Sequence, residues 1–189
     1  MRTLAGMKPL LACVLALATG ATNSIALADP IHALANGDYW HHDSGWIFPE
    51  RVGEFVRIGF PQDVAGSRDA VGYYERQMND ARIVVDVDLF AAESAADDIT
   101  WAQTRASLTS AAKPGPDEIR EDTTDLGRGR LATRVRYTPA NGAPAQAWYF
   151  IVVGDWRVRV RATLPASSGE AASHLDDFVR SQQWDRLAH

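Results

Sequence analysis

An α+β domain built on a mainly antiparallel β-sheet is the architecture that this sequence predicts. Two turn dipeptides, Asn79-Asp80 and Gly154-Asp155, are each flanked by long runs of strong β-formers, which is typical of hairpins. Two further segments, residues 91–112 and the residues after Ser167, have the spacing of helices. The order of strands, helix, strands and helix is that of an α+β domain with two principal helices.

The N-terminal 28 residues have the pattern of a secretory signal peptide. Arg2 and Lys8 form a short basic start, and an apolar stretch follows it. Ala26-Leu27-Ala28 is a small-x-small cleavage site. Polar residues interrupt the apolar run before it reaches the roughly 20 residues that a membrane span needs. We therefore expect cleavage after Ala28, a periplasmic or secreted location, and no transmembrane anchor on the mature chain.

The single cysteine, Cys13, lies inside this leader. Leu10 to Cys13 resembles a lipoprotein cleavage box, so lipidation is the alternative fate of the leader. Such a box follows its apolar region, whereas here the apolar region continues beyond Cys13. After cleavage the chain would contain no cysteine, and an exported protein without disulfides depends on its hydrophobic core for stability.

Charge excludes some classes of partner. The chain has a formal charge of −5, and the leader contains only basic charges, so the mature protein is more acidic still. An acidic protein is a poor partner for nucleic acid or for an anionic membrane surface. We expect neither.

Residues 29–43 are polar and lack periodicity, which predicts a loosely ordered arm before a single α+β domain at residues 44–189. Alternating or β-rich segments predict strands at residues 46–48, 55–60, 70–78, 81–90, 131–137, 145–153 and 156–164. The segment 117–126 is acidic and without a pattern, so no element is assigned to it.

The two helices are predicted by periodicity and by end signals. Residues 91–112 place Ile99, Ala102 and Ala106 on one face, and Pro114 ends the helix. Ser167 and Glu170 form a capping box that opens the second helix. Its apolar side consists of Ala171, Leu175, Phe178 and Val179.

A family resemblance covers residues 46–184. The order of elements, the sequence Gly45-Trp46-Ile47-Phe48-Pro49, and residues 150–164 followed by the closing helix resemble the Mog1/PsbP-type α/β sandwich, including exported bacterial proteins of unknown function. The resemblance implies mostly non-catalytic binding and accessory roles. It rests on topology, so no functional residue is carried over from it.

The second hairpin can be placed in register. With Gly154-Asp155 as the turn, Phe150 faces Arg159 and Trp148 faces Arg161. Tyr149, Ile151, Val158 and Val160 then share the apolar side, which must face the core. We expect the preceding strand to put Leu131, Val135 and Tyr137 on that core side. Pairing Val135 with Tyr149 places them on the core side, and a register shifted by two residues gives the same result.

In that register the non-core face interleaves guanidinium groups with aromatic rings. Its members are Arg134, Arg136, Trp148, Phe150, Arg159 and Arg161. Arginine forks bind carboxylates and rings stack on planar groups, so this face predicts a site for an anionic ligand or envelope component. The structural alternative is that the arginines stack on cross-strand rings and pair with Asp86 and Asp88, or that a helix covers them.

Other motifs have simpler interpretations. His41-His42-Asp43, with His32 and Asp38 nearby, contains metal-ligand residue types, but adjacent histidines on an extended chain point to opposite sides. We therefore expect a solvated arm and no metal. Ser110-x-x-Lys113 has the spacing of some acyl-enzymes, yet no companion motif accompanies it. Phosphate-binding glycine loops and dinucleotide fingerprints are missing from the sequence, so no cofactor is expected.

These features favour an exported, non-catalytic binding or accessory module. The alternative is a small cell-envelope hydrolase or lyase, which a pocket with strongly displaced pKa values would indicate. A third possibility is an assembly factor with an exposed apolar patch around Trp40, Trp46 and Phe48. No motif in the chain identifies the ligand, the partner or the oligomeric state.

Overall fold

The computed structural model describes residues 30–63, 68–79, 81–92, 99–100, 102–104, 118–139, 142–165 and 169–187. The predicted signal peptide, Cys13, the Ser110-x-x-Lys113 spacing and Ser167 of the capping box lie outside these residues. No helix in the described ranges is long and apolar enough to cross a membrane.

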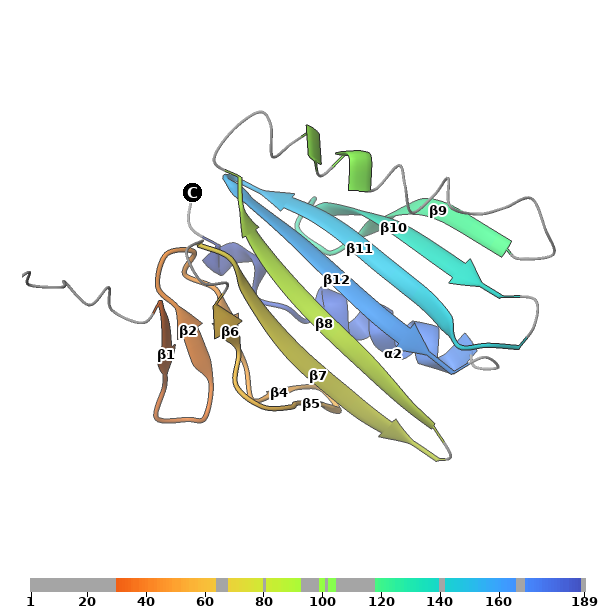
Figure 1. Cartoon of the computed structure of the whole chain (residues 1–189), viewed down its shortest axis with the longest axis horizontal. Helices are drawn as coiled ribbons and strands as arrows, with labels where there is room; N and C mark the ends of the chain where they lie inside the picture. Colours follow the sequence, from red (N-terminus) through yellow and green to blue (C-terminus); the bar gives the residue numbers. More distant parts are fainter. Residues whose placement is uncertain are drawn as a thin grey trace, which may run out of the picture.

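Most of the described chain is antiparallel β-sheet, with few helices, which confirms the β-rich α+β character (Figure 1). The strands are β1 (Ile31–Ala33), β2 (Tyr39–His41), β3 (Ile47–Phe48), β4 (Arg51–Val52), β5 (Phe55–Arg57), β6 (Gln62–Asp63), β7 (Ala70–Met78), β8 (Ala81–Ala91), β9 (Glu118–Asp125), β10 (Leu131–Thr138), β11 (Ala145–Val153) and β12 (Trp156–Leu164). Helix α2 spans Gly169–Arg180, and a short 3-10 helix, η1, spans Trp184–Arg186. Residues 99–100 and 102–104 are also helical.

One large sheet forms the body of the molecule. Its strand order is β4-β5-β7-β8-β12-β11-β10-β9, and β6 also pairs with β7. The hairpins β7–β8 and β11–β12 have the predicted turns, because Met78 pairs with Ala81 and Val153 pairs with Trp156. The central pair, β12 with β8, joins these two hairpins and is the only link between them within the sheet path.

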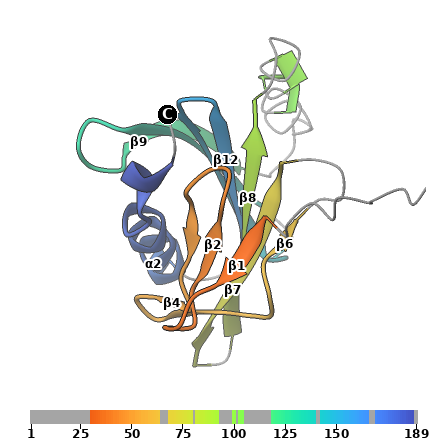
Figure 2. The same cartoon turned by 90° about the vertical axis from the view of Figure 1, so that its left-hand side faces the viewer.

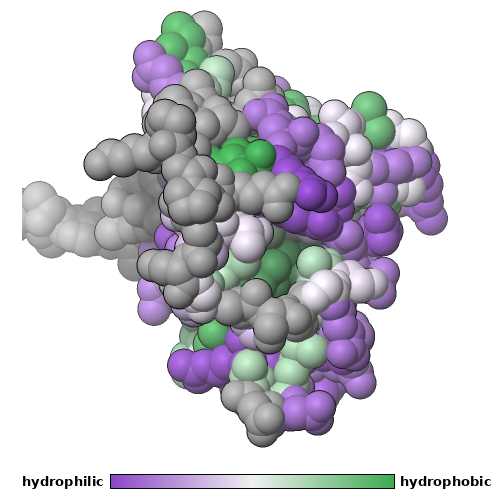
Figure 3. Space-filling model, turned by 90° about the vertical axis from the view of Figure 1, so that its right-hand side faces the viewer, coloured by the Kyte–Doolittle hydropathy of each residue, from purple (hydrophilic) through white to green (hydrophobic). Residues whose placement is uncertain are grey.

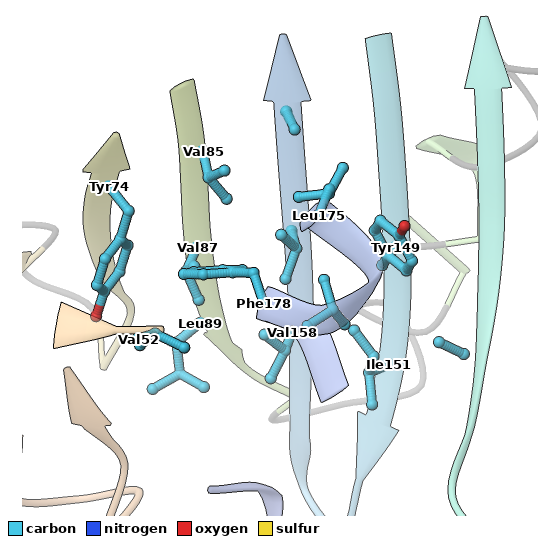
Figure 4. Close-up of a cluster of buried hydrophobic side chains, with 14 of the residues drawn as sticks. Val52, Tyr74, Val85, Val87, Leu89, Tyr149, Ile151, Val158, Leu175 and Phe178 are labelled. Atoms are coloured by element: carbon cyan, nitrogen blue, oxygen red, sulfur yellow. The ribbon is translucent and has the colours of Figure 1, made fainter. Parts of the chain in front are cut away.

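Helix α2 covers one face of this sheet, which we call the helix face (Figure 2). Ala171, Leu175, Phe178 and Val179 are its buried residues, as their helical spacing predicted. Phe178 and Leu175 point toward alternate residues of β8, β12 and β11, such as Val87 and Val158 (Figure 4). Burying one such side chain contributes about 1.5–3 kcal/mol, so this layer is the main source of stability.

The opposite side of the sheet is called the outer face. Residues Asp86, Asp88 and Phe90 of β8 and Arg157, Arg159 and Arg161 of β12 alternate with the buried valines and leucine of the helix face. Side chains along a strand point to the two faces in turn, so these polar residues share one surface. That surface contains the candidate site.

A second, three-stranded sheet formed by β1, β2 and β3 replaces the loosely ordered arm that we expected for residues 29–43. It packs on the same core as α2, because Ile31 and Phe48 belong to the main core cluster and Trp46 stacks against Trp184. Strands of two or three residues are too short for their alternation to be read from sequence. That is why the prediction was wrong there.

The apolar patch suggested for an assembly factor does not form. Trp46 is 1% exposed and Phe48 is 0% exposed, and Trp40 is half-buried. Large exposed hydrophobic residues in the described ranges are scattered: Leu34, Ile58, Phe60, Ile99, Leu131 and Val152. Among the coloured residues in Figure 3, hydrophilic ones predominate on the right of the view and hydrophobic ones form separate areas.

The acidic segment to which we assigned no element contains strand β9. It pairs with β10 along its whole length, from Glu118 opposite Thr138 to Asp125 opposite Leu131. As the last strand in the sheet order, β9 has a free edge, and charged residues are typical of such edges because they discourage pairing between molecules. A charged edge strand lacks the apolar alternation that identifies buried strands.

Candidate ligand-binding site on the outer face

The register predicted for the second hairpin is confirmed. Phe150 pairs with Arg159 and Trp148 pairs with Arg161, while Tyr149, Ile151, Val158 and Val160 are buried on the helix face. Four of the six predicted ligand-binding residues, Trp148, Phe150, Arg159 and Arg161, therefore share the outer face.

The register predicted for the neighbouring strand is wrong by one residue. Val135 pairs with Trp148 and Arg134 pairs with Tyr149, instead of Val135 with Tyr149. A shift of one residue moves every side chain of a strand to the other face. Arg134 and Arg136 consequently lie on the helix face, away from the other four predicted residues.

The reason for this register lies in helix α2. Its Asp176 carboxylate accepts hydrogen bonds from Arg134 Nη1 at 2.9 Å, from Arg136 Nη2 at 3.0 Å and from the Tyr149 hydroxyl. A half-buried carboxylate beneath a helix needs such partners. Leu131, Val135 and Tyr137, which we expected in the main core, are on the outer face, and Leu131 is exposed.

Arg134 also forms a two-point ion pair with Asp122 of β9, Nε to Oδ1 at 2.8 Å and Nη2 to Oδ2 at 2.6 Å. The hydrogen bonds from Arg134 lower the pKa of Asp122, and the same bonds raise the pKa of Arg134. Burial, together with the bond to Asp176, raises the pKa of Tyr149. Apart from Arg136 Nε, which has no hydrogen-bond partner among the described residues, these side chains bond to one another. The network therefore connects α2 to the sheet.

The two predicted aromatic residues are buried on the outer face. Trp148 is 9% exposed and Phe150 is 4% exposed, and both pack with Val135, which is fully buried. Ile119 and Tyr137 complete this second apolar cluster. The rings are therefore unavailable for stacking on a ligand. At this end of the sheet the apolar residues of β10 pack on the outer face and its arginines lie on the helix face, which explains why the apolar residues of β10 did not identify the core side.

The remaining arginines form a ladder of ion pairs with β8. Arg161 donates from Nε to Asp86 Oδ2 at 2.8 Å and also from Nη2 to the same oxygen, and this bonding raises its pKa. Arg159 donates from Nε to Asp88 Oδ2 at 2.7 Å. The arginines of this face therefore pair with Asp86 and Asp88, as the structural alternative in the sequence analysis expected. Both carboxylates are largely buried, so removal of either arginine alone would leave a buried charge without its partner.

Arg159 differs from Arg161 because both of its η nitrogens remain available to donate hydrogen bonds to a ligand. Its Nε is bonded to Asp88, and its two η nitrogens have no partner within the described part of the chain. The guanidinium lies over the Phe90 ring, with Cζ 5.2 Å from the ring centroid. The ring and the ion pair together hold two N–H-bearing nitrogens in a fixed direction, which is the arrangement that binds a carboxylate.

A hollow of about 190 Å³ adjoins this guanidinium. Its described lining consists of Asp69, Phe90, Ala91, Ala92, Thr100, Thr104, Arg157 and Arg159. Arg157 is held by hydrogen bonds from Nη1 to the carbonyl oxygens of Gly154 and Trp156. Asp69 is held by the Ala91 amide, which donates to its Oδ1 at 3.1 Å. The hollow thus combines cations, hydroxyls, one carboxylate and an apolar ring.

Sequence reasoning found Arg159 but missed Phe90, Arg157 and Asp69. Phe90 continues the alternation of Asp86 and Asp88 along β8, which was a usable signal. Phe90 lies beside Arg157 only because β8 pairs with β12, and these two strands are more than 60 residues apart in the chain. No local sequence pattern specifies that pairing.

The histidines of the N-terminal region lie on two sides of the small sheet, with the rings of His32 and His42 in contact on one side and His41 on the other. His41 is fully buried, with Nδ1 2.7 Å from Ser44 Oγ, and burial lowers its pKa. His32 and His42 contact Trp40 on the other side of the small sheet. Across the described residues, no three His, Cys, Asp or Glu side chains gather as metal ligands.

Comparison with known proteins adds no relative: no protein-family profile, no curated protein and no solved structure matches this chain.

Proposed function

We propose that this chain is an exported protein that begins at Asp29 after cleavage and acts by binding a ligand in the cell envelope. The N-terminal pattern of a basic start, an apolar stretch and Ala26-Leu27-Ala28 supports export. The site proposed for the ligand is the hollow beside Phe90, Arg157 and Arg159.

The binding proposal rests on one observation: the Arg159 guanidinium is held in place while its η nitrogens have no described protein acceptor. Asp88 and Phe90 fix this guanidinium. An arginine arranged in this way can form a two-point hydrogen bond with a carboxylate, and a charge-assisted bond contributes about 1.5–3 kcal/mol. The Phe90 ring supplies apolar contact for the rest of the ligand.

The size and charge of the hollow indicate the class of ligand. A volume of about 190 Å³ is below the roughly 300–1,000 Å³ of sites for drug-sized molecules, so the ligand is small or inserts one end. Arg157 and Arg159 favour a carboxylate, and Phe90 favours an aromatic or aliphatic body. The preferred ligand is therefore a small organic acid with an apolar body, or the acidic end of an envelope component.

A non-catalytic role is favoured over that of an envelope hydrolase or lyase. The groups with displaced pKa values include His41, Tyr74 and Tyr149, and none of these lines the hollow. Catalytic groups with tuned pKa values are typically located in the cleft where they act. The contrast supports binding.

We also infer that the complete fold is the two-helix α/β sandwich of the Mog1/PsbP type, in which residues 91–112 form the second principal helix. The helical residues 99–100 and 102–104, which lie on the side of the sheet opposite α2, support this arrangement (Figure 2). Such a helix would place Thr100 and Thr104 over the hollow that they line.

The test is a protein-observed NMR titration with 3-phenylpropionate, with the uncharged 3-phenylpropanol as the analogue. The variant is the pair D88N/R159Q, because removing only Arg159 would leave a largely buried carboxylate unpaired. The matched control is D86N/R161Q, which removes the neighbouring ion pair of the ladder outside the hollow.

We expect saturable binding of the acid, with shifts at Phe90 and Arg159, and binding about tenfold or more weaker for D88N/R159Q and for the alcohol. The control should bind like the wild type. Equal binding by both variants, equal loss in both, or no saturable binding of the acid would contradict the proposal.

A further inference from the structure

A second cavity, of about 440 Å³, lies between the β9–β10 turn and η1, and it is distinct from the hollow on the outer face. These two segments lie side by side in both cartoon views (Figures 1 and 2). The described lining of the cavity contains four arginines, Arg128, Arg130, Arg180 and Arg186, and one carboxylate, Asp185. We propose that this cavity binds a multiply charged phosphate group.

The cations outnumber the acceptors that the described protein offers them. Arg128 Nη1 and Arg130 Nη1 both donate to Asp185, the second at 3.4 Å. Arg180 donates from Nε to the Asp125 carbonyl oxygen at 3.4 Å, and its Nη1 lies 3.6 Å from Asp177 Oδ1. Arg186 has no ion pair among the described residues. Each guanidinium has five N–H donors, so most of the donors around the cavity remain available.

Neighbouring guanidinium groups repel one another. A protein with a formal charge of −5 has enough carboxylates to place one beside each arginine. Asp125 and Asp177 lie nearby, but the Asp125 carboxylate accepts the Gly127 amide at 2.7 Å and Asp177 is largely exposed. Four arginines in the lining of one cavity therefore favour an anion with several oxygens and more than one charge. Arginine is the side chain best suited to phosphate, because its fork matches two oxygens at once.

The β9–β10 turn holds Arg128 in an unusual conformation. Gly127, Arg128 and Gly129 all have positive φ, at 92°, 56° and 75°. Glycine adopts these values without strain, whereas a side chain does not, and strained residues of this kind concentrate at functional sites. The Arg128 guanidinium reaches Asp185 across the cavity. The turn thus places a cation at the rim at a conformational cost that glycine would avoid.

Isothermal titration calorimetry with inorganic pyrophosphate at low ionic strength tests this proposal. The two variants are R186Q, which breaks no described ion pair, and R128G, which relieves the backbone. The control is R82Q, an equal loss of charge on the exposed side of β8, where Arg82 pairs with Glu75. Vesicles of phosphatidylglycerol, compared with phosphatidylcholine, distinguish a lipid headgroup from a free phosphate compound.

We expect pyrophosphate binding that weakens about tenfold in R186Q and in R128G, with R82Q close to wild type. R128G should nevertheless be at least as stable as wild type in thermal unfolding, so that weaker binding cannot be attributed to misfolding. Competition by phosphatidylglycerol vesicles would identify a headgroup, and its absence a soluble phosphate. Undetectable pyrophosphate binding, or variants that bind like R82Q, would overturn the proposal.

Discussion

Gly72 of β7 lies directly against the ring of Phe48 in the small sheet. A Cβ atom on Gly72 would lie 2.5 Å from Phe48 Cδ1, and Phe48 is completely buried. Neither the strand backbone nor the enclosed ring has space to move. The small sheet therefore depends on the absence of a side chain at this position.

We predict that Gly72→Ala lowers the free energy of unfolding by about 1–3 kcal/mol, because overpacking forces the ring or the strand to shift. Denaturation by urea, followed by tryptophan fluorescence, measures this change. The control is Gly169→Ala at the first residue of α2, where a Cβ meets nothing within 4 Å. A Gly72→Ala protein as stable as the control would contradict this close packing of Gly72 on Phe48.

His41 makes stability depend on pH. Burial lowers its pKa below the ordinary histidine value of 6.5, an effect that nearby Asp43 opposes and Arg68 assists. Between the folded and unfolded pKa values the unfolded chain binds a proton that the folded chain does not. This contribution to stability is therefore complete above pH 6.5 and is lost as the pH falls below it.

We predict that the free energy of unfolding decreases on acidification from about pH 7.5 to 5, with a slope from His41 of at most about 1.4 kcal/mol per pH unit. The His41→Phe variant, which preserves a ring beside Trp156, should show a shallower slope over the same range. Urea titrations at several pH values provide the measurement. Identical slopes for the two proteins would remove His41 from this explanation.

Among the secondary-structure elements, helix α2 is positioned by its apolar side and by one acid. Asp176 accepts hydrogen bonds from Arg134, Arg136 and Tyr149 on two neighbouring strands. These bonds exist only in the register that places Arg134 opposite Tyr149. The helix and the register of β10 therefore specify each other.

We predict that Asp176→Asn destabilises the protein by about 1–3 kcal/mol, because buried guanidinium donors lose a charged acceptor. Asp177→Asn, at the exposed neighbour on the same helix, should change stability by less than about 0.5 kcal/mol. Thermal and urea unfolding compare the two variants. Equal stability of the two would contradict the pairing of β10 with β11 described above.

The elements that were predicted correctly are those with strong local signals. The hairpins β7–β8 and β11–β12 have long β-rich arms and two-residue turns, and α2 has a clear apolar stripe. The errors fall where local signals conflict or are missing. In β10 the apolar residues and the arginines alternate, and which set faces the core depends on Asp176, which is 40 residues or more away.

Considered as a whole molecule, the protein separates its arginines by face. Arg134 and Arg136 connect the helix to the sheet, Arg159 and Arg161 form the ladder on the outer face, and a third group surrounds the cavity at η1. Four of the six residues predicted for the ligand face share the outer face, because the turn of the second hairpin fixed its register. Only the three-dimensional pairing of β8 with β12 brought Phe90 and Arg157 to Arg159.

Native mass spectrometry of protein purified from the periplasm of an expressing bacterium tests both parts of the proposed function, export and ligand binding, in one measurement. We predict a chain mass that begins at Asp29 and a small acidic adduct that is present in the wild type and in D86N/R161Q and absent in D88N/R159Q. An intact Met1 on cytosolic protein would contradict export. An adduct retained by D88N/R159Q, or lost from both paired variants, would contradict a binding site at Arg159.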